Sequence, residues 1–424
     1  MVLTRAISKT TRYKAERLLR AVARAKPIGV MSVAPTYTQG GAGVNSTINA
    51  SATATGANSA SQKPTYVGSD ARLEWVSAHV SLDAWNGFGW IPDHKTKAAS
   101  GNYRYLGSDG WGVRFATDAQ AFDFNAALNT SATGSGGTGA CRVLVTDLAT
   151  GLTEWTRAAD YTGDASWRYY KFDFGSRAPR GRLITIYFTG NAFFVGLNVG
   201  AQDRVWKEPS PDEAKIAYFG DSYGEGVGVT SSIRGALPYV FGELMGAPNV
   251  ISSSSAGTGY ANAGSNVTWA ARVARDMDYN LIGDMDLVTV FGTANDNAQS
   301  DSAVTAAITS TITDLMVAQP NAIIVVAGPQ YAVGIQTTLA RYALVKAAVQ
   351  AVPGYGGRLF YVDNGPADQN WMSGLGKQGA TTGTGNGDFY VASDGVHPYD
   401  AAGSSYLATR LKGAVVPILQ GLAA

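Results

Sequence analysis

Three polar residues in the C-terminal half of the chain have the side chains of a catalytic nucleophile, acid and base: Ser222, Asp394 and His397. Ser222 stands in the string Gly-Asp-Ser-Tyr-Gly, and the other two stand in Asp-Gly-Val-His-Pro. A serine hydroxyl attacks a carbonyl when a histidine accepts its proton, and a carboxylate holds that histidine in the right tautomer. One tight turn can bring Asp394 and His397 together, and no other histidine follows position 94. This pattern predicts acyl transfer through Ser222.

The segments around these residues alternate between apolar strand-like runs and helical periods. The runs are 215–220, 249–255, 286–293, 321–328 and 358–365, and the candidate helices lie near 233–246, 267–277, 301–318, 335–351 and 400–421. Such alternation predicts a parallel sheet covered by helices on both faces. Sites in parallel sheets lie beyond the carboxyl ends of the strands, and Ser222 follows the first strand directly.

Four blocks in this region resemble, in order, those of the SGNH hydrolase (GDSL-like lipase/esterase) superfamily. They are GDSYGEG at 220–226, SAGTG at 255–259, GTAND at 292–296 and DGVHP at 394–398. The resemblance covers residues 213–424. It implies a flavodoxin-like three-layer α/β/α domain with a five-stranded parallel sheet, which hydrolyses esters with a Ser-His-Asp triad and needs neither metal nor cofactor.

The resemblance also implies an oxyanion hole. Its donors would be the backbone N–H of Ser222, the N–H of Gly257 and the side-chain amide of Asn295, with Gly259 as the alternative glycine. One additional residue separates Gly292 from Asn295, compared with the family pattern.

The string Gly-Asp-Ser-Tyr-Gly also fits the Gly-x-Ser-x-Gly nucleophile elbow of α/β-hydrolases. In that fold several strands precede the elbow, and the acid and the base lie on separate loops. Here the serine follows the first strand of its domain and the acid and base share one turn, which favours the SGNH interpretation.

Residues 1–65 are predicted to form a basic helix followed by a low-complexity linker or anchoring segment. Residues 1–26 hold eight Lys/Arg and one acidic residue, and Pro27 stops the helix. One apolar stripe is formed by Ala15, Leu18, Leu19 and Val22. Such a helix can dock on a partner subunit or bind a membrane or nucleic acid. The Gly/Ala/Ser/Thr/Asn tract at 36–62 is either a linker or extended structure held by a neighbour.

Residues 66–210 are predicted to form an antiparallel β-sandwich (jelly-roll-like). Short aromatic and β-branched runs recur there with turn residues between them, at 111–116, 121–128, 141–148, 168–175, 182–190 and 192–200. Their aromatic residues either stack on sugar rings or fill the core.

Several function classes lack support in the composition. The net charge of +1 gives no general argument for a nucleic-acid partner, and no apolar run approaches the ~20 residues of a membrane helix. Cys141 opens an apolar run and is predicted to be a buried thiol. The acid pairs Asp276/Asp278 and Asp284/Asp286 are expected to be solvated turns rather than metal ligands.

The stretch 364–393 is long for a connection in a compact domain, which is typical of functional or disordered loops. Trp371 and Tyr390 within it either line an acyl or sugar site or pack in the ordinary way.

A β-sandwich in front of an SGNH-type domain resembles the layout of some carbohydrate esterases. This resemblance implies removal of O-acetyl groups from a polysaccharide by a serine esterase. The alternatives are an SGNH lipase or thioesterase, and a mainly structural or glycan-binding virion protein. The basic N-terminus lacks the apolar region of a secretory signal. The expected location is the virion, as part of a phage tail, and the alternative location is the cytoplasm. Residues 1–65 would then contact a virion partner or a second copy of the chain.

Overall fold

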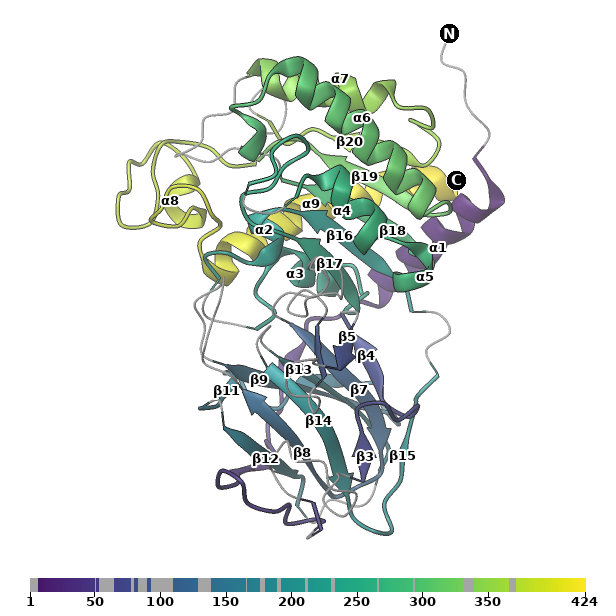
Figure 1. The fold of residues 1–424 in the computed structure, drawn as a ribbon, viewed down its shortest axis with the longest axis vertical. Coiled ribbons are helices and arrows are strands. Elements are labelled where there is room, and N and C mark those ends of the chain that lie inside the picture. Colours follow the sequence, from purple (N-terminus) through teal and green to yellow (C-terminus); the bar gives the residue numbers. More distant parts are fainter. Residues whose placement is uncertain are drawn as a thin grey trace. The chain divides into compact units, whose positions relative to one another are not determined.

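The computed structural model describes residues 7–49, 51–52, 65–77, 80–82, 90–92, 110–128, 139–164, 166–175, 180–188, 192–209, 213–229, 233–264, 267–292, 294–330, 339–365 and 371–424. Contacts divide the chain into two compact units. One combines Met1–Lys26 with Asp212–Ala424, and the other contains most of residues 27–211. We call them the α/β unit and the β unit (Figure 1).

A five-stranded parallel sheet forms the centre of the α/β unit, as the sequence predicts. Its strands lie in the order β17 (Val250–Ser254), β16 (Ile216–Gly220), β18 (Leu287–Phe291), β19 (Ile323–Ala327) and β20 (Leu359–Val362). The strand order reverses beside β16, because the next two strands lie on either side of it. Parallel sheets bind ligands at such a reversal, beyond the carboxyl ends of the strands.

Alternate residues of these strands face two separate apolar cores. Ile216 and Tyr218 lie in a core with α1, α3 and α9, whereas Ala217 and Phe219 lie in a core with α4, α6 and α7. Helices therefore cover both faces of the sheet (Figure 1). The helices of the unit are α1 (Lys9–Arg24), α2 (Ser222–Glu225), α3 (Leu237–Leu244), α4 (Trp269–Asp276), α5 (Tyr279–Ile282), α6 (Asp301–Ala318), α7 (Leu339–Ala351), α8 (Gly387–Tyr390) and α9 (Asp400–Ala423), with a 3₁₀ turn at Ala294–Asp296.

The N-terminal helix α1 packs on the α/β unit of its own chain. Ala15 and Leu18 are fully buried, and Leu19 and Val22 pack against the same core. The helix lies alongside α9 (Figure 1). The apolar stripe that the sequence offered to a partner or a membrane is thus covered within the chain, and α1 does not form one segment with the tract that follows it.

Ion pairs fix α1 in this place. Lys14 is almost completely buried and donates hydrogen bonds to Asp284 Oδ1 and to the Met285 carbonyl, both at 2.6 Å. Arg17 donates from Nε to Asp286 Oδ1 at 3.0 Å, and the Asp286 side chain is fully buried. Asp284 and Asp286 were expected to be solvated turn residues, and for Asp286 this expectation is wrong because it has a cationic partner from the N-terminus.

The expectation is also wrong for Asp276, which is fully buried at the end of α4. It accepts a hydrogen bond from Ser253 Oγ at 2.8 Å and pairs with Arg275 at 2.9 Å. Asp278 caps α5 by accepting from the Asn280 N–H at 2.9 Å.

The β unit contains two mainly antiparallel sheets around one aromatic core. Among the described strands, one sheet has the order β1-β10-β9-β13-β7-β15, with β11 on β9 and β4 on β7; the other has the order β2-β12-β8-β14-β6-β5, with β3 on β14. Their bounds are β1 (Gly29–Val30), β2 (Thr36–Gln39), β3 (Tyr66–Val67), β4 (Glu74–Val76), β5 (Val80–Leu82), β6 (Trp90–Pro92), β7 (Trp111–Thr117), β8 (Ala121–Leu128), β9 (Ala140–Asp147), β10 (Thr153–Trp155), β11 (Tyr161–Thr162), β12 (Trp167–Asp173), β13 (Arg182–Phe188), β14 (Ala192–Val199) and β15 (Val205–Trp206).

Aromatic side chains fill the core of the β unit. Phe115 and Phe188 from one sheet and Phe124 and Phe194 from the other lie in a single buried cluster. Cys141 is fully buried in the same cluster, and burial raises the pKa of its thiol. The described aromatic residues of this unit are buried or half-buried, which matches the core-filling alternative.

Part of the low-complexity tract is held by the β unit. β2 pairs with β12, and Ser46 donates from Oγ to the buried carboxylate of Asp123 at 2.6 Å. Ser46 Oγ also accepts from the N–H groups of Ile48 and Asn49. β2 is thus extended structure held by a neighbour, and Ser46 ties a turn to the same unit, while residues 50 and 53–64 lie outside the described part. Within the described part of the chain, no helix is long and apolar enough to cross a membrane.

Candidate active site

Ser222 lies two residues beyond the carboxyl end of β16, at the turn that the sequence suggests. It begins the short helix α2, and Asp221 caps that helix by accepting a hydrogen bond from the Tyr223 N–H at 3.1 Å. Gly226 ends α2 in the left-handed conformation, with φ of 87°. This tight turn leaves Ser222 only 6% exposed.

Asp394 and His397 meet in the turn that precedes α9. His397 Nδ1 and Asp394 Oδ2 are 2.6 Å apart, and Asp394 Oδ1 accepts from the N–H groups of Val396 and His397 at 2.8 and 3.0 Å. The Asp394 carboxylate thus holds His397 through both its ring and its backbone N–H, and Nδ1 is the ring nitrogen that donates. In such an arrangement Nε2 is the nitrogen that remains to accept a proton.

Burial by itself would raise the pKa of Asp394, but the hydrogen bonds from the His397 ring and from the Val396 and His397 N–H groups hold it below the ordinary value of 3.8. The carboxyl group is therefore ionised at neutral pH, as a partner for an imidazolium must be.

Tyr223 and Gly228 connect the serine turn to the histidine turn. The buried Tyr223 donates its hydroxyl hydrogen to the Val396 carbonyl, and its ring centre lies 6.0 Å from that of His397. A Cβ atom placed on Gly228 would lie 3.2 Å from His397 Cβ, so the two loops are in close contact. Within the described residues the Ser222 hydroxyl has no hydrogen bond to His397, so neighbouring residues join the two turns here. Sequence reasoning missed Tyr223, although it directly follows the serine.

The glycine block forms a turn beyond β17. Gly257 has φ of 72°, and a Cβ atom there would meet nothing within 4 Å, so its backbone is open to a ligand. The Gly259 N–H instead donates to the Asn262 carbonyl at 2.8 Å. Within the described residues, the N–H groups of Ser222 and Gly257 donate to no acceptor. Gly257 is therefore the better candidate of the two glycines.

Asn295 lies close to the serine turn but has acceptors of its own. Its Nδ2 donates to the Thr258 carbonyl at 2.9 Å and to Asp221 Oδ2 at 3.3 Å. Gly292 must be a glycine, because its φ is 138° and a Cβ atom there would lie 2.5 Å from Asp221 Oδ2. Asp221 thus ties the serine turn to the block at 292–296.

Two acidic residues hold the glycine turn, and sequence reasoning assigned a role to neither. Asp296 is buried and accepts from the N–H groups of Tyr260, Ala261 and Asn262 at 2.8 to 3.0 Å. Glu225 accepts from the Ala256 N–H at 2.5 Å. Their role is indicated by the backbone N–H groups that they accept on either side of Gly257, whose own N–H has no acceptor among the described residues. These groups come together only in the folded structure.

The described part of the stretch 364–393 is organised by hydrogen bonds. Asn386 donates to the Trp371 carbonyl and to the Tyr406 hydroxyl, both at 2.9 Å. Trp371 is 1% exposed and stacks on Phe291, and Tyr390 stacks on Tyr406 at 4.2 Å. Both aromatic residues therefore pack in the ordinary way.

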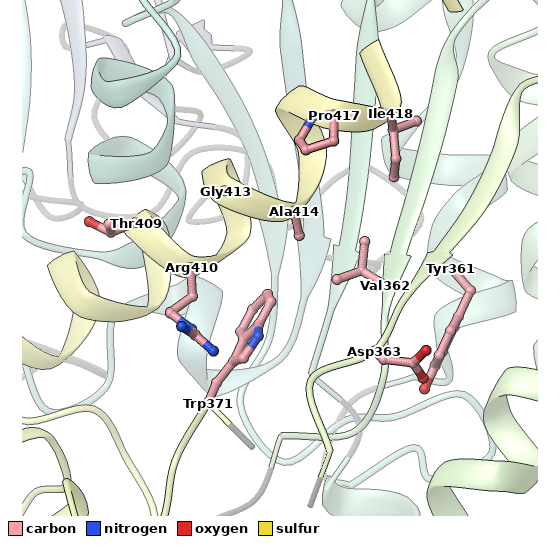
Figure 2. A pocket seen from close by; sticks show the side chains of 10 residues that line it. All are labelled: Tyr361, Val362, Asp363, Trp371, Thr409, Arg410, Gly413, Ala414, Pro417 and Ile418. Atoms are coloured by element: carbon pink, nitrogen blue, oxygen red, sulfur yellow. The ribbon is translucent and has the colours of Figure 1, made fainter. Parts of the chain in front are cut away.

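A groove of about 760 Å³ lies between α9 and the end of the edge strand β20 (Figure 2). Its lining includes Tyr361, Asp363, Trp371 and Arg410 and none of the three proposed catalytic residues. Trp371 separates it from Phe291, whose ring contacts Tyr223. We therefore place the candidate active site at the serine turn and not in this groove.

No protein-family model matches the chain, and no curated protein matches it. Solved structures do. The salicylyl-acyltransferase SsfX3 from a tetracycline biosynthetic pathway matches with a TM-score of 0.56 and 15% identity, over 83% of this chain and 97% of the other. The chain shares its fold.

Family two carbohydrate esterases are similar to a comparable degree. The enzyme from Clostridium thermocellum, in complex with cellohexaose, matches with a TM-score of 0.53 and 14% identity over 82% of this chain and 99% of its own. The enzyme from Cellvibrio japonicus has a TM-score of 0.53 and 13% identity, over 84% of this chain and 97% of its own. At these identities the comparison shows a common fold over 82% to 84% of this chain.

Proposed function

We propose that the chain is a serine esterase in which Ser222 is the nucleophile, His397 the base and Asp394 the residue that orients the base. The observation that carries this proposal is the 2.6 Å contact between His397 Nδ1 and Asp394 Oδ2, in a turn that packs on the serine turn. The shared fold with carbohydrate esterases and an acyltransferase supports it.

In the first half of the reaction, the Ser222 Oγ attacks the ester carbonyl while His397 Nε2 takes its proton. The C–O bond to the alcohol then breaks, and His397 returns the proton to the leaving oxygen. In the second half, His397 removes a proton from water as the water attacks the acyl-serine. The bond between the acyl carbon and Ser222 Oγ then breaks, and His397 returns the proton to Oγ as the carboxylic acid leaves.

The negative oxygen of each tetrahedral intermediate needs preorganised donors. The N–H groups of Ser222 and Gly257 are the candidates, since neither has an acceptor among the described residues. Asn295 would serve as a third donor only by exchanging its long bond to Asp221 for one to the oxyanion. The mechanism uses protein groups alone, so we expect EDTA to leave turnover unchanged.

As substrate we propose an O-acetyl group on a polysaccharide, with lipid esters and thioesters as the alternatives. The family two carbohydrate esterases support this choice, and the exposed side chain of Tyr399 (42%), two residues after His397, offers apolar surface to a sugar ring. A setting in a phage tail stays a proposal that rests on the sequence alone.

The test compares the wild type with Ser222→Ala on p-nitrophenyl acetate and on acetylated and deacetylated xylan. We expect acetate release by the wild type only, with Ser222→Ala folded and inactive. A folded Ser222→Ala that keeps turnover would refute the mechanism. Faster turnover of long-chain esters than of acetyl esters would refute the proposed substrate class.

A further inference from the structure

Arg272 on α4 is a fully buried cation that the mechanism above does not use. Its guanidinium lies over the Phe219 ring, 4.5 Å from the centre. Burying a charge is costly unless good hydrogen bonds surround it. The hydrogen bonds of Arg272 therefore indicate its role in the candidate active site.

These bonds go to the carboxyl ends of two neighbouring strands. Arg272 Nη2 donates to the Gly220 carbonyl at 2.8 Å and to the Ser253 carbonyl at 2.9 Å. Gly220 ends β16, two residues before Ser222, and Ser253 lies in β17, which leads into the glycine turn. One nitrogen thus fixes the distance between the backbones that carry the two proposed oxyanion donors.

The other terminal nitrogen of Arg272 reaches the glycine turn itself. Nη1 donates to Thr258 Oγ1 at 3.1 Å, and Trp269 Nε1 donates to the same oxygen at 3.1 Å. Thr258 Oγ1 donates in turn to the Ser255 carbonyl at 2.6 Å. With two donors received and one proton given, the Thr258 hydroxyl has a single orientation.

Thr258 links this arrangement to the third proposed donor. It directly follows Gly257, so its position sets the direction of the adjacent peptide groups. Its carbonyl accepts from Asn295 Nδ2 at 2.9 Å. Each proposed donor is thus close to an acceptor of Arg272. Ser222 lies two residues after Gly220, Gly257 lies next to Thr258, and Asn295 donates to the Thr258 carbonyl.

We propose that Arg272 is a positioning residue, which holds the N–H groups of Ser222 and Gly257 at the spacing that the transition-state oxyanion requires. This inference rests on the proposed function. A lysine cannot replace the planar fork, because an ammonium group is a point charge that cannot span acceptors on both strands and on Thr258.

The experiment measures kcat, KM and the affinity for a boronic acid, which mimics the tetrahedral intermediate. It uses the full-length wild type, Arg272→Met and Arg272→Lys. The concentration of active sites is determined by labelling with a fluorophosphonate, so that kcat refers to folded protein. Arg358→Met is the control, because Arg358 also makes three hydrogen bonds. Its acceptors are the carbonyls of Met316, Gln319 and Ala322, which precede β19 and therefore lie toward the amino ends of the strands, away from the serine turn.

We expect kcat per labelled site to fall about 100-fold in Arg272→Met and about 10-fold in Arg272→Lys, with KM within about 3-fold of the wild type. Boronate affinity should fall in parallel with kcat/KM. Arg358→Met should lower the melting temperature and leave kcat per labelled site unchanged.

If Arg272→Met does not fold, Arg272→Lys decides. Wild-type kcat and boronate affinity in a folded Arg272 variant would overturn the inference, since a merely structural role changes stability alone. A wild type with neither turnover nor labelling would instead overturn the proposed function, and this result comes before any variant is compared.

Discussion

At the scale of single residues, the candidate site depends on backbone N–H groups that the fold leaves without acceptors. Gly257 is the clearest case. Glu225 and Asp296 accept from N–H groups on either side of it, and Asn262 Nδ2 donates to its carbonyl, while its own N–H has no acceptor among the described residues. Donors that are oriented before the reaction stabilise an oxyanion without reorganisation.

Gly257→Ala should therefore lower kcat by about 10-fold or more, because alanine strains a backbone with φ of 72° and turns the N–H away. Gly356→Ala is the matched control. Gly356 has φ of 78°, has open space around its Cβ position, and lies before β20, at the sheet edge opposite the site. Both variants should lose about 1 kcal/mol of stability or somewhat more. Equal turnover per folded molecule in the two variants would remove Gly257 from the oxyanion hole.

The Asp394–His397 bond predicts a pH dependence of stability. The folded-state pKa of Asp394 lies below 3.8, so its contribution is complete above pH 3.8 and is lost as the pH falls through the lowered pKa. Asp394→Asn lacks this term. Urea unfolding of both proteins between about pH 5 and about pH 2.5 should show the advantage of the wild type shrinking as the pH falls. A difference that stays constant over this range would contradict the assigned bond.

Sequence reasoning could predict where Ser222 and the glycine turn lie, because each follows a buried strand. It could also place Asp394 and His397 in one turn before the last helix. Their action as a triad stays a proposal. Sequence reasoning could not distinguish the roles of Asn295 and Asp296. Both are polar residues in the same block, and only the fold shows that Asp296 accepts three N–H groups from a turn more than 30 residues away. Arg272 was equally hidden, since an arginine on an amphipathic helix is usually exposed.

At the scale of elements, α1 is the main departure from what the sequence suggested. The five strands and the later helices could be predicted from local apolar patterns. The place of α1 could not, because Lys14 and Arg17 find their acidic partners about 270 residues further along the chain. A basic amphipathic helix has the same local pattern whether it covers its own core or a partner.

Arg17→Met should accordingly destabilise the α/β unit by about 3–5 kcal/mol, because it leaves the buried Asp286 carboxylate without its cation. Arg20→Met is the control on the same helix. Arg20 is half-exposed and lies 3.9 Å from Glu16, so its loss should cost less than about 1 kcal/mol. Chemical denaturation of both variants measures the difference. Equal stabilities would mean that α1 does not dock as described.

At the scale of the whole molecule, the chain enters the α/β unit at α1, leaves it for the β unit and returns at residue 212. Removal of the residues before 66 therefore takes away α1, which is part of the α/β unit. We expect such a truncated protein to lose stability and turnover together, although every proposed catalytic residue lies after position 213.

Separate cores predict two unfolding transitions in calorimetry. Phe124 is fully buried in the core of the β unit, and Leu18 is fully buried in that of the α/β unit. Phe124→Ala and Leu18→Ala should each cost about 3–5 kcal/mol. Leu18→Ala should shift only the transition that coincides with loss of esterase activity, and Phe124→Ala only the other. If Phe124→Ala shifts the transition at which activity is lost and Leu18→Ala does not, the assignment of α1 to the α/β unit would be contradicted.

The most direct test of the whole account is the site at which a fluorophosphonate probe reacts. The probe forms a covalent bond with a serine that a nearby histidine deprotonates, so it reports the proposed chemistry without knowledge of the substrate. We predict one adduct per chain in the intact mass, located on Ser222 by peptide mapping, and no adduct in folded Ser222→Ala or His397→Ala. Labelling at another serine, or undiminished labelling of His397→Ala, would contradict the proposed nucleophile and base.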